Sequence, residues 1–366
     1  MTILLFILIL LLLIIGHEFG HFLVAKISGM KVPEFGVGFP PKLWGKKFGE
    51  TEYTVNALPL GGFVKIYGED PSETEVSTDT TDAFFKKPKL LQAGTLVAGP
   101  FMNIAMAFIL SVTAFMLGVP AALDSGYSPA DIHGASIAVV DVLSGSPAAV
   151  AGVLPGDHII SITASGATTP VSNPDMLSSI VSAAEGSITL NLVRSDKPLS
   201  ISVTPAKGTV PDAPQQKAVG IATAAIGTLQ LPFFEAIAAG FQETLQNAWA
   251  ILTGLISLIA SAFTLSANLS SVAGPVGIAG LVGDAARFGL GSVLSFAALI
   301  SINLGIINLF PFPALDGGRL ALLAVEAVTR RRVPTNIANT INAVGFAALI
   351  ILMVVVTAHD VFRLIS

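Results

Sequence analysis

Two histidines and a glutamate lie close together in an otherwise aliphatic stretch near the N-terminus. The sequence His17-Glu18-Phe19-Gly20-His21 is an HExxH pattern, which is typical of zinc proteases. Residues four apart share one face of a helix, so both imidazoles can bind a single ion. Glu18 then lies beside the water that such an ion activates. The same pattern also occurs in helices without metal, where the histidines are surface residues.

The surrounding residues argue against that second interpretation. Thr2 to Gly16 is almost wholly aliphatic and Phe22 to Ala25 continues the run, so the ionisable residues lie within a predicted membrane span. An ionisable side chain at the centre of a bilayer costs about 2.5–3.5 kcal/mol or more and is by default functional. No basic region precedes the run and no small-residue cleavage site follows it, so we expect a retained helix rather than a signal peptide.

A catalytic zinc site needs a third protein ligand and an open position for water. The remaining histidines, His133, His158 and His359, lie in or beside segments expected outside the membrane. The candidate is Asp316, in the sequence NLFPFPALDGG that begins at Asn308. An aspartate before two glycines is more often a turn residue, but this turn interrupts an apolar span. Broken backbone in a membrane is tolerated only where it is packed in protein or lines a water-filled cavity.

The composition places the chain in a membrane. Hydrophobic residues make up 52% of the 366 residues and charged residues only 12%, which is far from the average of soluble domains. A net charge of −5 with only short basic runs gives no electrostatic footprint for nucleic acid. The chain has no cysteine, so His, Asp or Glu must hold any metal. Two histidines and one carboxylate also suit iron, so ligand type alone leaves the metal open.

The hydropathy pattern predicts a polytopic α-helical membrane protein with about four transmembrane helices and an inserted β-rich PDZ-like domain. Residues 232–262 form an amphipathic helical pattern that is expected to lie against the membrane or against the domain above it, with a fifth span as the alternative. The predicted segments are a first helix at 1–28, an inner-side loop with a β hairpin at 29–90, a second helix at 91–119, the PDZ-like domain at 120–207, a linker and amphipathic helix at 208–288, a broken third helix at 289–329, and a loop and fourth helix at 330–366.

The inserted domain is predicted from short strands separated by turns. Strands are expected at 136–142, 158–163, 188–193 and 199–204. The run from Gly145 to Ala149, followed by Ala151-Gly152 and Gly156-Asp157, resembles the PDZ domain, which binds extended peptide ends at a sheet edge. Another small β-rich domain without a peptide ligand is the alternative.

Basic residues set the expected orientation. The loop from Gly29 to Leu90 carries eight lysines, whereas the longer stretch from Pro120 to Asp284 carries four Lys or Arg. Arg319 and Arg330 to Arg332 lie between the third and fourth spans. By the positive-inside rule, the N-terminus, the PDZ-like domain and the C-terminus face outward.

Two motifs together resemble the site-2 protease family of intramembrane zinc metalloproteases: HEFGH in the first span and NLFPFPALDGG in the third. Further stretches are similar to its bacterial branch, the regulator of sigma-E protease type, and these are Gly36-Val37-Gly38-Phe39, Leu58 to Lys65, Gly99-Pro100-Phe101-Met102-Asn103 and Gly274 to Ala279. The resemblance covers nearly the whole length. This chain has room for a single PDZ domain, where some members of the branch carry two.

The resemblance implies a Zn²⁺ site of His17, His21 and Asp316, with Glu18 as the general base. It also implies that Asn308 contacts the substrate or the developing oxyanion. A membrane-reentrant β hairpin, from Glu34 to Phe39 and from Thr51 to Lys65, would lie beside the active site; an ordinary hairpin at the inner surface is the alternative.

The expected partners are single-span membrane proteins, by resemblance anti-sigma factors or remnant signal peptides, cut by regulated intramembrane proteolysis in a bacterial inner membrane. A catalytically inactive PDZ membrane scaffold is the alternative function, and the intact Glu18 argues against it. A transporter would be expected to show an inverted repeat, and none is evident. The sequence leaves open the substrate, the cleavage position, the need for a prior cleavage and the oligomeric state.

Overall fold

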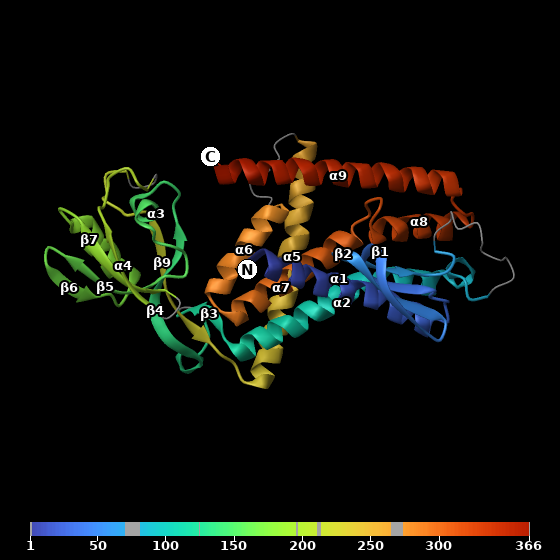
Figure 1. The fold of residues 1–366 in the computed structure, drawn as a ribbon, viewed down its shortest axis with the longest axis horizontal. Helices are drawn as coiled ribbons and strands as arrows, with labels where there is room; N and C mark the ends of the chain where they lie inside the picture. The colour runs from blue at the N-terminus through green and yellow to red at the C-terminus, as the bar shows by residue number, and fades with distance from the viewer. Residues whose placement is uncertain are drawn as a thin grey trace. The chain divides into compact units, whose positions relative to one another are not determined.

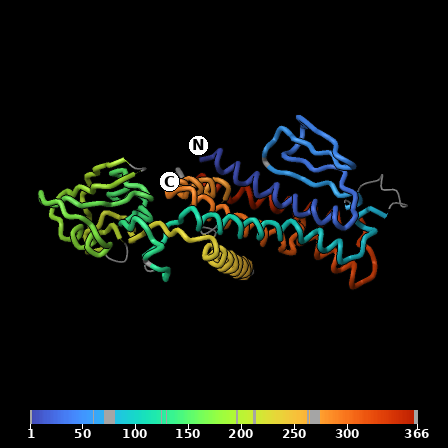
Figure 2. Tube along the Cα trace, turned by 90° about the horizontal axis from the view of Figure 1, so that it is seen from below, coloured from blue at the N-terminus to red at the C-terminus, as the bar shows by residue number. Residues whose placement is uncertain are grey.

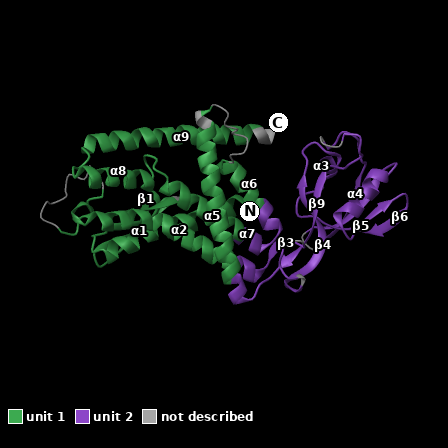
Figure 3. Cartoon of the chain, turned by 180° about the vertical axis from the view of Figure 1, so that it is seen from behind, with its two compact units in different colours: residues 1–112, 237–283, 295–366 green, residues 113–236, 284–294 purple. Residues whose placement is uncertain are grey.

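The computed structural model describes residues 2–69, 81–123, 125–194, 197–210, 214–264 and 274–365. The chain divides into two compact units (Figure 3). Unit 1 comprises residues 1–112, 237–283 and 295–366 and is mainly helical; unit 2 comprises residues 113–236 and 284–294 and contains a large β-sheet. The fold class predicted from the sequence, a helical membrane protein with an inserted antiparallel β domain, is confirmed.

Long apolar helices dominate unit 1 (Figure 1). The helices that lie wholly or mostly in this unit are α1 (Thr2–Ile27), α2 (Lys89–Leu117), α5 (Phe233–Phe263), α6 (Pro275–Arg287), α7 (Leu290–Leu309), α8 (Asp316–Thr329) and α9 (Thr335–Ile365). Within the described residues, five helices have the length and apolarity of a membrane span, namely α1, α2, α5, α7 and α9.

Helix α5 is the span candidate that the sequence left open. Its mean hydropathy, 1.3 over its most apolar window, is the lowest of the five. It runs across the direction that α1, α2 and α9 share (Figures 1 and 2). One face packs on α2 and α7, where Ala248 and Ile251 contact the cluster around Ala107 and Ile302. Several large apolar side chains of α5, including Phe241 and Trp249, are nevertheless exposed.

Glycines bring the helices of unit 1 close together. A Cβ atom on Gly20 of α1 would collide with the backbone of Ala98 in α2, and a Cβ on Gly240 of α5 would lie 2.7 Å from a methyl group of Val112 in α2. Small residues at helix crossings are the usual means of close packing in membranes, because lipid offers no hydrophobic driving force between helices. Helices α1 and α2 therefore approach closely at the level of the HExxH residues.

A β hairpin follows α1. Strands β1 (Glu34–Phe48) and β2 (Thr51–Lys65) pair antiparallel with several register shifts. Phe35 of β1 pairs with both Tyr53 and Val64, so the two halves of β2 flank the first half of β1. Strand β1 continues past Phe39, where the sequence pattern ended it, through Pro40 and Pro41 to Phe48.

The β domain of unit 2 is a seven-stranded antiparallel sheet in the order β3-β9-β4-β5-β7-β8, with β6 paired to β5. Its elements are β3 (Val119–Ala122), a 3-10 turn (Pro129–Asp131), β4 (Ile132–Val142), α3 (Pro147–Ala151), β5 (His158–Ala164), β6 (Ala167–Pro170), α4 (Pro174–Ala183), β7 (Ile188–Arg194), β8 (Lys197–Val203) and β9 (Ile221–Leu229). Fully buried aliphatic side chains, among them Ile159, Ile162 and Leu190, form its core.

Strand β9 corrects the sequence-based domain boundary. Residues 208–232 were expected to form a linker, but Ile221–Leu229 forms a strand between β3 and β4. Alanine, threonine and glycine fill most of β9, so it lacks the alternation of large apolar and polar residues that marks a strand in sequence. The β domain therefore extends to Leu229 rather than ending near residue 207.

Candidate metal centre

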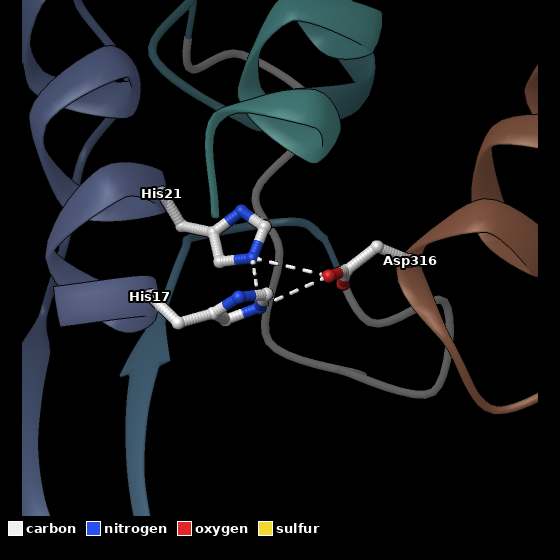
Figure 4. A group of neighbouring side chains, drawn as sticks. All are labelled: His17, His21 and Asp316. Carbon is white, nitrogen blue, oxygen red and sulfur yellow. Dashed lines mark hydrogen bonds and ion pairs between the residues drawn. The ribbon is translucent and has the colours of Figure 1, made fainter. Parts of the chain in front are cut away.

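The two histidines of the HExxH pattern lie on one face of α1 and point toward Asp316 at the beginning of α8 (Figure 4). Nε2 of His17 lies 3.1 Å from Nε2 of His21 and 3.1 Å from Oδ2 of Asp316. Nε2 of His21 lies 3.4 Å from the same carboxylate oxygen. Both histidines are buried, with 8% and 7% of their surface exposed. These three residues form a candidate metal site.

The spacing of these atoms suits a tetrahedral zinc ion. Zinc binds imidazole nitrogen and carboxylate oxygen at about 2.0–2.2 Å, so two ligand atoms of a tetrahedral ion lie about 3.3–3.6 Å apart. The observed separations of 3.1 to 3.4 Å are close to that value. Three protein ligands leave the fourth position for water or substrate, as in catalytic zinc sites.

A break between α7 and α8 positions Asp316. Helix α7 ends at Leu309 and α8 begins at Asp316. Ala314 lies in the left-handed region with φ of 73°, which is uncommon for a residue with a side chain. A Cβ on Gly317 would collide with the carbonyl oxygens of residues 309 and 310, and one on Gly318 with that of residue 312. The two glycines are therefore needed for the chain to turn back and bring Asp316 to the histidines.

A backbone carbonyl fixes the tautomer of His21. Nδ1 of this ring lies 2.8 Å from the carbonyl oxygen of Thr95 in α2. A carbonyl oxygen only accepts hydrogen bonds, so Nδ1 carries the hydrogen and Nε2 of the neutral ring keeps its lone pair. Nε2 is the atom that faces His17 and Asp316. Such contacts behind a ligand orient metal-binding histidines in many proteins.

Asn103 of α2 has the corresponding position behind His17. Its amide group lies 3.1 Å from Nδ1 of the ring. Its Oδ1 is buried and has no hydrogen-bond partner among the residues that the structure describes. A half turn of the amide, which exchanges two groups of nearly equal size, lets Oδ1 accept a hydrogen bond from Nδ1–H. Nε2 of His17 then keeps its lone pair, so the buried, otherwise unpaired oxygen fits a metal-binding tautomer.

Gly99 of α2 leaves room for both imidazoles. A Cβ on this residue would collide with Nε2 of His21 and lie 2.7 Å from Nε2 of His17. Sequence reasoning placed Gly99 and Asn103 only in a family-like motif and gave neither a role at the metal site. They lie more than 70 positions from the histidines in the chain, and only the packing of α2 on α1 reveals the contact.

Glu18 and Asn308 line one cavity with two of the candidate ligands, His17 and Asp316. The cavity has a volume of about 230 Å³. Its lining residues are Ile14, His17, Glu18, Asn103, Leu304, Asn308, Ala314, Leu315 and Asp316. Oε2 of Glu18 accepts a hydrogen bond of 3.1 Å from the backbone N–H of Val64 in β2, so the hairpin contacts the residue expected to act as base. The structure thus brings together all five residues that the sequence singled out.

A helical membrane region with two histidines, a carboxylate and an adjacent glutamate around a cavity defines the class of membrane metallopeptidases. The sequence profile of peptidase family M50 matches residues 5–352. The chain is 30% identical to the regulator of sigma-W protease RasP of Bacillus subtilis (strain 168), over 99% of each chain. It is also 30% identical to the zinc metalloprotease RasP of Geobacillus kaustophilus (strain HTA426), over 95% of each chain.

The chain therefore belongs to peptidase family M50, the site-2 proteases. It is a multi-pass membrane protein and a zinc metalloprotease of the intramembrane type. Its family membership and its candidate metal site agree on the metal, since the relatives are zinc enzymes and the donor set fits zinc.

Proposed function

We propose that the protein hydrolyses peptide bonds within the transmembrane segments of single-span membrane proteins. His17, His21 and Asp316 hold the zinc ion and Glu18 is the general base. The observation that carries this assignment is that His17, Glu18 and Asp316 line one cavity in the membrane region, with His21 grouped beside the other two ligands. A scaffold would gain nothing from placing a glutamate beside two buried histidines.

When bound, zinc supplies a Lewis acid that polarises the scissile carbonyl and lowers the pKa of the attacking water. Glu18 takes the proton from that water as it attacks the carbonyl carbon, and passes it to the nitrogen of the leaving amine. The hydrogen bond from Val64 N–H to one carboxylate oxygen of Glu18 holds the side chain in place. Asn308, on the cavity wall, donates from its amide to the oxygen that becomes negative during attack.

The hairpin supplies a place to hold the substrate extended. A peptide bond within a helix is shielded, so a substrate helix must unwind before its carbonyl can be attacked. The end of β2 reaches the active site at Val64. Gly62 lies beside Glu18, because a Cβ added to this glycine would be 3.5 Å from Cγ of the glutamate. A strand edge at this position can pair with an unwound substrate through main-chain hydrogen bonds.

The proposed substrates are anti-sigma factors or signal peptides left in the membrane after secretion. One relative is a regulator of sigma-W protease by name, which favours the first class. Both classes present a single apolar helix, which is what a cavity between membrane helices can accept.

We also propose that the β domain binds peptide ends in the manner of a PDZ domain. Strand β3 pairs with Ile226–Leu229 of β9, and Leu123 N–H donates to Ala225. Within the described residues, no strand pairs with residues 221–224 on that side of β9, and α4 lies next to β9. A short peptide can therefore add to this edge. Peptides with a free carboxyl end should bind more tightly than amidated ones in a fluorescence titration; equal binding would contradict recognition of peptide ends.

The test of the enzymatic function uses the purified protein in detergent and a panel of single-span peptides. Mass spectrometry should place the cut within the apolar segment. A chelator should abolish the cut, and added Zn²⁺ should restore it. Anaerobic Fe²⁺ serves as the comparison, because the same ligands suit iron. Cleavage only in water-exposed loops, or cleavage that survives chelation, would show that the proposal is wrong.

We propose that the β domain lies on the outer side of a bacterial inner membrane and that α5 lies along the membrane rather than across it. The chain has no cysteine, so single cysteines can report sidedness. Cysteines at Lys46 and Arg331 should react from the inside and one at Ala206 from the outside. Finding residues 46 and 206 on the same side would exclude this orientation.

A further inference from the structure

A second cavity lies at the end of unit 1 where α2 and α9 begin. Its volume is about 270 Å³, and it shares no lining residue with the catalytic cavity. Lys89 and Thr335, the first residues of two span candidates, both line it. The turn between α8 and α9 lies at the same end (Figures 1 and 2). The cavity is therefore at the level where apolar spans meet water.

Two basic runs that are far apart in the sequence meet at this cavity. Lys86 lies over the ring of Phe85, with its Nζ 5.9 Å from the ring centroid, and Arg332 lies over the same ring at 4.9 Å. Phe85 and Arg332 both line the cavity. One run belongs to the segment before α2 and the other to the turn after α8, so only the fold brings them together.

The carboxylates at this cavity already have cationic partners. Glu326 pairs with Lys89 and Glu69 pairs with Arg319, each at 2.5 Å. Glu326 also accepts a hydrogen bond of 3.0 Å from the backbone N–H of Val333. Two further cations at the cavity, Lys86 and Arg332, form no ion pair with any residue that the structure describes. The rim of the cavity thus has an excess of positive charge.

The inner wall of the cavity is apolar. Phe84, Leu96 and Leu323 line it and are almost fully buried. A charged rim above an apolar wall matches a ligand with an anionic end and an apolar body. Inorganic anions would use only the rim.

We propose that this cavity binds the phosphate headgroup of an anionic phospholipid. Arg332 can donate paired hydrogen bonds to phosphate oxygens, which guanidinium groups do better than ammonium groups. Lys86, over the same Phe85 ring, adds a second cation, and the glycerol and first acyl carbons lie against the apolar wall. Basic pockets between membrane helices are known places for such headgroups. The bilayer supplies this ligand at high local concentration.

The test uses the full-length protein in phosphatidylcholine nanodiscs that contain a minority of phosphatidylglycerol. Native mass spectrometry measures how many molecules of each lipid stay bound after release. The double variant Lys86→Gln/Arg332→Gln removes two exposed cations that form no described ion pair. A hydrogen bond between charged groups in a specific site contributes a factor of about ten or more to binding. We therefore expect phosphatidylglycerol retention at this site to fall by about 100-fold, with Arg332→Gln alone giving an intermediate loss.

The matched control is Lys46→Gln/Lys47→Gln. It removes the same charge from exposed positions of β1 outside the cavity, and Lys46 also lies over an aromatic ring, that of Phe48. The control should retain phosphatidylglycerol as the parent does. Equal retention by the parent and both double variants, or equal loss in both double variants, would overturn the proposal, since the second result shows general charge attraction. Displacement of the lipid by inorganic phosphate at equal concentration would also overturn it, because a bare anion would then suffice.

Discussion

The membrane region and the β domain arrange polar and apolar side chains in opposite ways. In α1, Leu4 and Leu8 are 72% and 60% exposed, whereas His17 and His21 are 8% and 7% exposed. In the β domain, aliphatic residues such as Ile162 and Leu190 are fully buried and most polar side chains lie outside. Water favours the second arrangement through the hydrophobic effect. Lipid removes that driving force, so apolar side chains of unit 1 can face outward. Its polar side chains, such as His17 and His21, are buried where they can form a site.

This difference shows where chemistry lies in the molecule. Buried polar groups of the β domain form hydrogen bonds with adjacent protein groups. Asp157, for example, accepts hydrogen bonds from the Arg194 side chain and from the backbone N–H of Leu154. These bonds raise the pKa of the Arg194 guanidinium. Buried polar groups at the metal centre converge on a cavity instead. The following substitutions test that contrast, from the largest expected effect to the smallest.

Gly99→Ala should remove the metal. The new methyl group has no room beside the two Nε2 atoms, so the imidazoles must move out of ligating geometry. Zinc content, measured by elemental analysis, should fall to near zero. Gly94→Ala is the control, because the same helix has open space there and alanine favours a helix over glycine by about 1 kcal/mol. Full zinc in Gly99→Ala would mean that α2 does not pack on the histidines as described.

Asn103→Ala should weaken zinc binding without abolishing it. Loss of the hydrogen bond behind His17 frees the ring to adopt the wrong tautomer, and removal of such contacts typically lowers metal affinity about 10–100-fold. Competition with a coloured chelator measures the affinity. Ser301→Ala is the control, since Ser301 donates to the backbone carbonyl of Asn103 and does not touch His17. An unchanged affinity in Asn103→Ala would rule out the orienting role.

Asp157→Asn should destabilise the β domain and leave the metal centre intact. Breaking a buried ion pair costs about 3–5 kcal/mol, and we expect about 2 kcal/mol here because the Arg194 side chain is 32% exposed. Denaturant unfolding followed by a probe in the β domain measures the loss. Asp175→Asn removes an exposed carboxylate of α4 and should change the free energy of unfolding by less than about 0.5 kcal/mol. Reduced zinc content in Asp157→Asn would show that the two regions are not energetically separate.

The sequence was most informative where residues that can do chemistry lie in a membrane span, because ionisable side chains are costly to bury there. Ionisable residues inside an apolar run are unusual enough that His17, Glu18 and His21 could be singled out, and the Pro-Gly cluster after Asn308 indicated the break that carries Asp316. The fold class could be predicted from hydrophobic patterns. Long uncharged apolar runs indicate membrane helices, whereas short alternating runs indicate strands.

The rest depends on contacts between distant segments. The local sequence assigns neither Gly94 nor Gly99 a contact with the histidines, yet Gly99 lies against the imidazoles whereas Gly94 has open space around it. Strand β9 lacks a regular alternation of large apolar and polar residues and is defined by its pairing with β3 and β4. The meeting of the two basic runs at Phe85 likewise follows from packing, because each run alone indicates only which side of the membrane it occupies.

The most direct test of the proposed catalytic centre separates metal binding from catalysis. Glu18→Gln keeps the size of the side chain and removes the base, so it should retain near-stoichiometric zinc and lose about 10²–10⁴-fold in cleavage rate. Asp316→Asn removes an anionic ligand and should lower zinc content itself. Zinc and cleavage of one single-span peptide are measured on both variants in the same preparation. Normal cleavage by Glu18→Gln, or tight zinc and cleavage in Asp316→Asn, would contradict the assigned roles.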